Sequence, residues 1–230
     1  MEVGIVGAGL SGCTAAHKLA MAGHKVFIYD DQQVLGGLAR TATTKYCKIY
    51  EPFGNHSFHT KKKSIWDWIN SFVDFRIYEH RKGIMLFNDI IYPYPLHTED
   101  IQNKFPIRIA TKIYHELKNV THKKGRNFRE CVVDMIGPTL YSLTVENYTR
   151  SQWGCDPEML LPDWAPKRIE IRDDDDDRLF RDEYQGVPKL GYTFLCSRIT
   201  AHKNINVFLN IHIDTSMIRK LMDKYDIVLC

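Results

Sequence analysis

The first thirty residues alternate between short apolar runs and a segment with helical spacing. Residues 3–6 and 26–29 are apolar throughout, as in short buried strands, whereas residues 11–22 fit a helix that Gly23 closes. A strand, a helix and a second strand within about 30 residues form the βαβ unit of a parallel sheet. This pattern predicts an α/β fold that opens with a doubly wound, Rossmann-like sheet.

The hydrophobic pattern changes after residue 60. Residues 64–72 have helical spacing, and two apolar runs on either side of residues 88–89 predict an antiparallel hairpin with a tight turn. Between residues 100 and 148 apolar side chains recur every three or four positions, which predicts helices, with a polar loop at 121–127 between them. We therefore expect a helical and small antiparallel-sheet region inserted into the sheet domain.

The last part of the chain lacks regular spacing at first. Beyond Trp153 the sequence predicts mainly loops, until two apolar runs at 204–213 and 225–230 indicate strands that rejoin the first sheet. Three segments follow from this pattern. They are a Rossmann-like cofactor-binding segment at 1–60, a substrate region at 61–200, and returning strands at 201–230.

Composition and charge narrow the class of protein. The 230 residues are 44% hydrophobic, and 31 basic against 28 acidic side chains leave a net charge of +3. So small a charge gives no reason to expect nucleic acid or a membrane surface as a partner. No apolar stretch approaches the roughly 20 residues of a membrane span, and the N-terminus lacks a signal-peptide pattern, so we expect a cytoplasmic protein. The six cysteines show no C-x-x-C spacing, which predicts reduced residues, mostly in the core.

A glycine-rich turn lies between the first predicted strand and the first helix. Gly7 permits the tight turn, Gly9 lets the backbone approach a pyrophosphate, and Gly12 lets the helix pack closely on the strand. Leu10 and Ser11 stand where this turn meets the helix and are further cofactor candidates, because the helix N-terminus would face the phosphates. An ordinary glycine turn is the alternative, but strand, turn and helix stand in the order that dinucleotide binding requires.

Two further features refine the cofactor. Asp30 follows the second strand directly and would accept hydrogen bonds from the ribose hydroxyls of an adenosine. The motif "GGLAR" then brings Gly36, Gly37 and Leu38 near the same phosphate site. A second turn without side chains favours FAD over NAD, although a plain loop has the same composition.

Three more segments point to one family. They are "FGNHSFHT" at 53–60, "NYTRSQWGCDP" at 147–157 and "YQGVPKLGYT" at 184–193. Together with the glycine motif they resemble UDP-galactopyranose mutases, and the similarity continues through "KRIEIRDDDDDRLF". The resemblance implies an FAD flavoprotein, an isomerase that interconverts the pyranose and furanose forms of a UDP-sugar. In that chemistry the N5 atom of the reduced flavin attacks the anomeric carbon and displaces UDP.

The resemblance also implies roles for side chains in the substrate region. Arg168 matches the family's catalytic, diphosphate-binding arginine, and Lys167 is its rival because the loop before it carries about one extra residue. A surface charge on a strand is the other interpretation of Arg168. Tyr148 and Trp153 match a mobile substrate loop whose aromatic side chains cover the nucleotide, with core packing as the alternative.

A histidine-containing loop completes the expected site. In this family the loop that matches Asn55 and His56 lies against the flavin ring, which makes His56 a catalytic candidate, and His59 accompanies it. Ile213 is expected as a further cofactor contact. Two histidines three apart also suggest a metal, but no further ligands stand at a familiar spacing. The acidic run at 173–177 lacks the spacing of an EF-hand, so we predict a solvated loop there.

The sequence departs from the family pattern in three places. Leu179 stands where a substrate-contacting tyrosine is expected, and Pro95 replaces an asparagine, which leaves the identity of the sugar open. In the family the strand that matches 225–230 leads into a long C-terminal portion, so we expect a fold truncated at the C-terminus. The chain would then be incomplete or one half of a split enzyme, completed by a separately encoded polypeptide or by a homo-oligomer. A general FAD oxidoreductase and a non-catalytic nucleotide-binding remnant are the alternatives.

Overall fold

The chain folds into two compact units in the computed structural model, which describes residues 1–46, 48–87, 89–121, 125–163 and 169–230. The first unit combines Met1–Tyr78 with Asp182–Cys230, and the second unit is Glu79–Arg181. These boundaries differ from the expected 60/61 and 200/201, because residues 61–78 and 182–200 contribute helices and strands to the first unit.

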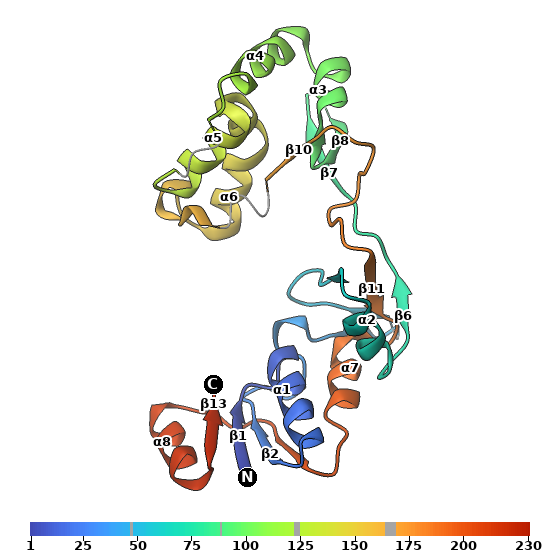
Figure 1. The fold of residues 1–230 in the computed structure, drawn as a ribbon, viewed down its shortest axis with the longest axis vertical. Helices are drawn as coiled ribbons and strands as arrows, with labels where there is room; N and C mark the ends of the chain where they lie inside the picture. Colours follow the sequence, from blue (N-terminus) through green and yellow to red (C-terminus); the bar gives the residue numbers. More distant parts are fainter. Residues whose placement is uncertain (47, 88, 122–124, 164–168) are drawn as a thin grey trace. The chain divides into compact units, whose positions relative to one another are not determined.

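The first unit is built on a parallel sheet in which, over the described residues, four strands lie side by side (Figure 1). In spatial order they are β12 (Ile205–Phe208), β2 (Lys25–Tyr29), β1 (Glu2–Val6) and β13 (Ile227–Leu229). Val3 lies opposite Val26 on one side and Ile227 on the other. The apolar runs near the end of the chain therefore return to the N-terminal sheet, as the hydrophobic pattern predicts.

Helices cover both faces of this sheet. Side chains alternate between the two faces of a strand. One face, with Val3 and Val26, packs against α1 (Leu10–Met21), and the other, with Tyr29, packs against α8 (Thr215–Lys224) and against Tyr225. A parallel sheet with helices on both faces is the doubly wound arrangement, so the predicted α/β class is confirmed.

A small antiparallel sheet and α7 complete the first unit. Its strands are β5 (Phe58–Thr60), β11 (Tyr184–Pro188) and β6 (Phe75–Ile77), in that spatial order. One apolar cluster joins them to α2 (Lys63–Asn70), to α7 (Gly191–Ile199) and to Cys13 of α1. Shorter elements in this unit are the 3-10 turn η1 (Gly37–Ala39) and the paired strands β3 (Ala42–Thr43) and β4 (Ile49–Tyr50).

The prediction of loops beyond Trp153 is wrong for α7, and α8, between the two predicted strands, was not predicted. Five of the nine residues of α7 are buried, among them Leu195 and Ile199, so the polar face that reveals an amphipathic helix is nearly lost. Helix α8 is short and begins at Asp214, whose carboxylate accepts a hydrogen bond from the Met217 amide at 2.8 Å. Tertiary packing decides α7 more than local spacing does.

The second unit contains a hairpin and a set of helices around one apolar core. Strand β7 (Lys82–Leu86) pairs antiparallel with β8 (Ile90–Tyr94), which confirms the predicted hairpin, and Asn88 lies outside the described residues. Strand β9 (Leu96–His97) pairs with β10 (Ile171–Arg172). The helical elements are α3 (Thr98–Lys104), α4 (Ile107–Leu117), α5 (Phe128–Leu140), η2 (Tyr141–Val145), α6 (Glu146–Trp153) and η3 (Pro157–Met159). Their buried core, which includes Ile113, Phe128 and Leu140, agrees with the predicted helical insertion.

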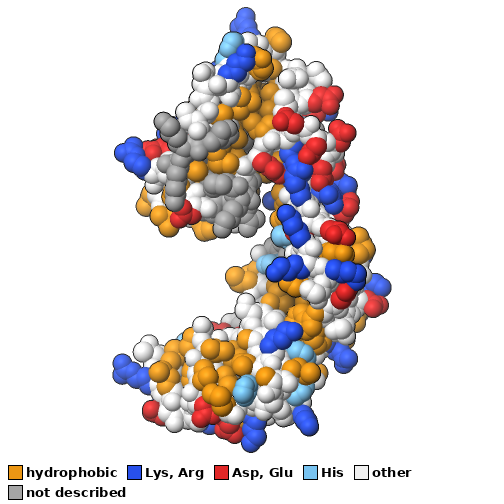
Figure 2. Space-filling view, viewed as in Figure 1, with side chains coloured by type: hydrophobic (Ala, Val, Ile, Leu, Met, Phe, Trp, Pro, Cys, Tyr) orange, Lys and Arg blue, Asp and Glu red, His pale blue; other side chains and the backbone are white. Residues whose placement is uncertain are grey.

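The surface carries charges of both signs. On the face drawn in Figure 2, Lys and Arg side chains lie interspersed with Asp and Glu side chains. Within the described part of the chain, every helix is too short or too polar to cross a bilayer.

Candidate functional site

The glycine turn between β1 and α1 is a close contact of backbone with backbone. The Gly7 amide donates a hydrogen bond to the Tyr29 carbonyl at 2.7 Å, which ties the turn to β2. A Cβ at Gly12 would lie 1.9 Å from the Gly7 carbonyl oxygen, so only glycine lets α1 start directly above the turn. Gly9 is the N-cap residue of α1 and has no side chain to bind the first helical amides at Leu10 and Ser11. These amides have no partners within the helix and favour an anion.

Asp30 lies beside this turn. Its Oδ2 atom accepts a hydrogen bond from the Ala8 amide at 2.5 Å, and its Oδ1 atom accepts one from the Gln32 amide at 2.8 Å. The Asp30 carbonyl in turn accepts a hydrogen bond from the Ile211 amide at 2.9 Å, which brings the segment after β12 to the end of β2. Ile213, two residues further on, is partly buried against the cluster around Tyr29.

The double-glycine turn contacts the first turn. The Gly36 amide donates a hydrogen bond to the Ala8 carbonyl at 2.9 Å, and Gly9 and Gly36 form an isolated parallel bridge. A Cβ at Gly37 would lie 3.1 Å from the Gly9 Cα, so a side chain there would crowd the first turn. Leu38, by contrast, is 70% exposed. The structure thus brings both predicted glycine turns and Asp30 to one end of the parallel sheet.

The residues at this end of the sheet fit a dinucleotide. Two stretches of backbone without side chains approach each other at the N-terminus of α1, where a pyrophosphate would meet amide donors. The carboxylate of Asp30 stands at the end of the neighbouring strand, where a ribose would present hydroxyl donors. The structure brings these groups together, and their roles toward a dinucleotide stay predictions.

His56 is fixed by Glu51 and Tyr192, neither of which is among the predicted site residues, although Tyr192 lies in the motif at 184–193. Glu51 accepts a hydrogen bond from the His56 amide at 2.5 Å, and its carboxylate lies 3.3 Å from the His56 Nδ1 atom. The Tyr192 hydroxyl donates a hydrogen bond to the His56 carbonyl at 2.6 Å. Next to His56, the Ser57 hydroxyl is buried and has no hydrogen-bond partner among the described residues. Such a hydroxyl fits a position where a ligand supplies the partner.

The other residues of the histidine loop point in different directions. Asn55 is exposed. His59, on β5, places its Nδ1 atom 2.7 Å from the Asp182 carboxylate, whereas His56 faces Glu51. Over the described residues, no three His, Cys, Asp or Glu side chains are grouped as a metal site would require.

In the second unit, Tyr148 and Trp153 both lie on α6 and are 61% and 55% exposed. Five residues of helix separate their directions by roughly 140°, so the two rings do not share a face. Tyr148 lies near Lys82, whose Nζ atom is 6.0 Å from the ring centre. Burial, with Tyr148 and Glu170 nearby, raises the pKa of Tyr94 to about 12. Arg168 and its rival Lys167 lie outside the described residues.

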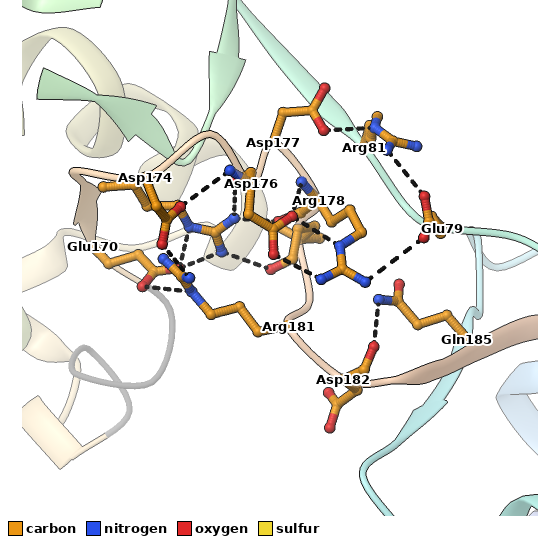
Figure 3. A network of polar contacts seen from close by, with 12 residues as sticks. Glu79, Arg81, Glu170, Asp174, Asp176, Asp177, Arg178, Arg181, Asp182 and Gln185 are labelled. Carbon is orange, nitrogen blue, oxygen red and sulfur yellow. Dashed lines mark hydrogen bonds and ion pairs between the residues drawn. The ribbon is translucent and has the colours of Figure 1, made fainter. Parts of the chain in front are cut away.

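The acidic run after β10 forms an ion-pair network with arginines (Figure 3). Arg178 binds both carboxylate oxygens of Asp176 at 2.8 Å, and Arg181 lies 2.5 Å from Asp174. Asp177 binds Arg81 at 2.7 Å. The Arg178 guanidinium holds the pKa of Asp176 well below its usual value. The prediction of a merely solvated loop therefore needs correction, since these carboxylates have protein partners.

Arg172 lies at the centre of this loop and is almost completely buried, with 1% of its surface exposed. Its guanidinium donates to the carbonyl oxygens of Asp176 and Arg178 at 2.6 and 2.5 Å and pairs with Glu170. A planar guanidinium with several donors can hold several acceptors at once. The loop is thus wrapped around one buried cation, which the sequence pattern does not reveal.

Comparisons with known proteins agree with this geometry. Residues 143–230 match the family model of UDP-galactopyranose mutase, and residues 5–72 match that of NAD(P)-binding Rossmann-like domains. The chain is 32% identical over 213 residues to a probable UDP-galactopyranose mutase of Klebsiella pneumoniae, which covers 89% of this chain and 54% of the relative. It is 28% identical over 226 residues to a dTDP-fucopyranose mutase of Escherichia coli, and this match covers 96% of this chain and 59% of the relative.

A solved structure shows the same fold. The crystal structure of a reduced UDP-galactopyranose mutase matches 90% of this chain and 48% of its own chain, with a TM-score of 0.75 and 18% identity. The chain spans about half the length of the curated relatives it matches. The family resemblance that the sequence motifs predict is confirmed.

Proposed function

The chain is a relative of the UDP-galactopyranose mutases that matches their N-terminal and central portion, and on this premise we propose that it acts in the pyranose–furanose interconversion of a UDP-sugar with FAD as cofactor. One observation carries the cofactor part of the proposal. It is the contact of the Gly9 and Gly36–Gly37 backbones at the N-terminus of α1, beside Asp30.

The residues of the first unit would hold FAD as follows. The amides at the start of α1 and the two glycine turns would bind the pyrophosphate, and Asp30 would accept hydrogen bonds from the adenosine ribose. The turn at Asn55 and His56, together with Leu38, His59 and Ile213, would line the rest of the cofactor. Reduced flavin supplies nucleophilic chemistry at the anomeric carbon of a sugar nucleotide.

The residues of the second unit would hold the substrate. We assign the diphosphate to Arg168, because a planar guanidinium can bind two phosphate oxygens at once. Tyr148 and Trp153 are exposed aromatic residues on α6, available to stack on the uracil or cover the nucleotide. A cation on the leaving diphosphate would stabilise the charge that develops as the glycosidic bond breaks.

A coupled binding and product assay tests the proposal. The purified chain is titrated with FAD, reduced with dithionite, supplied with UDP-galactopyranose, and analysed for the furanose product by chromatography. Since the chain spans about half the length of its relatives, the assay is repeated with a polypeptide that carries the remaining half of such a relative. Flavin binding followed by furanose formation in either reaction supports the proposal, and absence of flavin binding contradicts it.

A general dinucleotide-dependent oxidoreductase is the second candidate, favoured by the match of residues 5–72 to NAD(P)-binding Rossmann-like domains. The same assay separates the two. An isomerase leaves the substrate without net oxidation, whereas an oxidoreductase consumes one oxidant or reductant for each turnover. Net oxidation of a sugar nucleotide would therefore replace the proposed function.

A further inference from the structure

The first three residues of α7 contact both the double-glycine turn and the histidine loop. These residues are Gly191, Tyr192 and Thr193, and none of them belongs to the predicted cofactor residues. They stand far from both loops in the sequence. The hydrogen bonds of Tyr192 and Thr193 join positions 136 and 152 residues apart.

Tyr192 holds the histidine loop. Its ring is buried in the cluster beneath the small sheet, with 2% of the residue exposed, and its hydroxyl donates to the His56 carbonyl at 2.6 Å. Burial, assisted by the charge of Glu51, raises the pKa of Tyr192 above its usual value. The hydroxyl therefore keeps its proton and remains a donor at neutral pH.

Thr193 holds the double-glycine turn. Its hydroxyl oxygen accepts a hydrogen bond from the Thr41 amide at 2.9 Å and lies 3.1 Å from the Leu35 carbonyl, to which it can donate. Leu35 and Thr41 stand on either side of Gly36 and Gly37. One hydroxyl therefore connects the two ends of the turn.

Gly191 allows α7 to come this close. Its φ of +81° is a conformation that side chains disfavour, and a Cβ there would lie 2.5 Å from the Thr41 Oγ1 atom. The Thr193 amide also donates to the Thr41 hydroxyl at 3.3 Å. The N-terminal turn of α7 and the segment at Thr41 are thus packed without space for a larger residue.

We propose that Gly191, Tyr192 and Thr193 form a positioning clamp that fixes the histidine loop relative to the double-glycine turn. The clamp rests on the proposed function in one respect, namely that the two loops it positions are taken to bind the flavin. Its members are positioning residues, since the hydrogen bonds of Tyr192 and Thr193 run to the backbones of the two loops. The clamp ties two loops that are far apart in the sequence to the same helix N-terminus.

Hydrogen–deuterium exchange on the cofactor-free chain tests the clamp independently of flavin. Tyr192→Phe keeps the aromatic ring and removes the Tyr192 hydroxyl. Thr193→Val keeps the shape of the side chain and removes the Thr193 hydroxyl. The loss of one hydrogen bond should raise exchange about 2- to 12-fold. We expect the rise at residues 51–58 for Tyr192→Phe and at residues 34–41 for Thr193→Val. Ser197→Ala is the control, because Ser197 is exposed on the same helix. Within the described part of the chain, its hydroxyl donates only to the nearby Phe194 carbonyl.

A spectroscopic readout then links the clamp to the cofactor. With FAD bound, Tyr192→Phe should shift the visible absorption band and the midpoint potential of the flavin, while Ser197→Ala leaves both unchanged. If both variants exchange like the wild type, or if the faster exchange is spread over the whole unit, the clamp is wrong and the proposed function still stands. If the wild type binds no flavin, the proposed function fails. Faster exchange confined to the two loops would then show that the clamp exists but does not position a flavin, and this overturns the role assigned to the clamp.

Discussion

In the first unit the candidate cofactor site is formed mainly by backbone, whereas in the second unit the loop after β10 is held by side chains. Gly9, Gly36 and Gly37 meet through main-chain atoms. The loop after β10 is instead wrapped around Arg172 and tied by carboxylate–arginine pairs. A site that requires bare backbone needs glycines at fixed positions, so it leaves a pattern in the sequence. A site held by charged side chains leaves no such pattern, because exposed and buried arginines look alike there.

The largest expected effect tests whether the second unit depends on one side chain. Arg172→Met should lower the free energy of unfolding by about 3 kcal/mol, since the carbonyls of Asp176 and Arg178 and the carboxylate of Glu170 lose their donor. Urea denaturation measures the change. Arg108→Met, on the exposed side of α4, is the matched control. A loss below about 0.5 kcal/mol would show that side chains do not hold this loop.

The next effect tests whether the first site is made of backbone. Gly9→Val should weaken FAD binding by about 100-fold or more, roughly 2.7 kcal/mol, because valine adds a branched isopropyl group where a phosphate would meet the main chain. A fluorescence titration of FAD gives the dissociation constant. Met21→Val, an exposed change at the other end of α1, should leave it unaltered. If both variants bind FAD with equal affinity, the phosphate does not bind at this turn.

Local spacing was sufficient for one part of the candidate site and insufficient for the rest. The glycines and Asp30 lie within one βαβ unit, where strand and helix geometry fixes their relative positions. Tyr192 reaches His56 across 136 residues, and no local pattern encodes such a pair. For the same reason the sequence revealed α1 and the hairpin but not α7, whose buried residues only packing explains.

Arg168 offers a way to extend the comparison to the substrate. Arg168→Ala should weaken UDP binding by about 1.5 to 3 kcal/mol, the value of a charge-assisted hydrogen bond. Isothermal titration with UDP measures it, with Lys167→Ala as the neighbouring control. If Lys167→Ala has the larger effect, the alignment of this loop with the family is displaced by one residue. If neither change matters, the diphosphate is bound elsewhere.

Asp30 supplies a carboxylate beside the two glycine turns, so its removal should have a smaller effect than a new side chain at Gly9. Asp30→Ala should weaken FAD binding by about 1 to 2 kcal/mol, because the ribose hydroxyls lose a charged acceptor while the phosphate contacts remain. The matched control is Asp31→Ala, an exposed neighbour. A loss equal to that of Gly9→Val would mean that Asp30 also shapes the turn through its bond to the Ala8 amide.

The smallest effect concerns pH and the acidic loop of the second unit. Arg178 lowers the pKa of Asp176 in the folded chain, so the stabilisation is present above the unfolded pKa of about 4 and is lost as pH falls through the folded value. Asp176→Asn should therefore cost about 0.5 to 1 kcal/mol at pH 7, discounted for solvent screening, and progressively less below about pH 4. Urea denaturation from pH 7 to 2.5 follows the difference, with exposed Asp175→Asn as the control. A cost for Asp176→Asn that is the same at pH 2.5 as at pH 7 would show that its partner is not a charge, and the second unit would then resemble the first in depending on neutral hydrogen bonds.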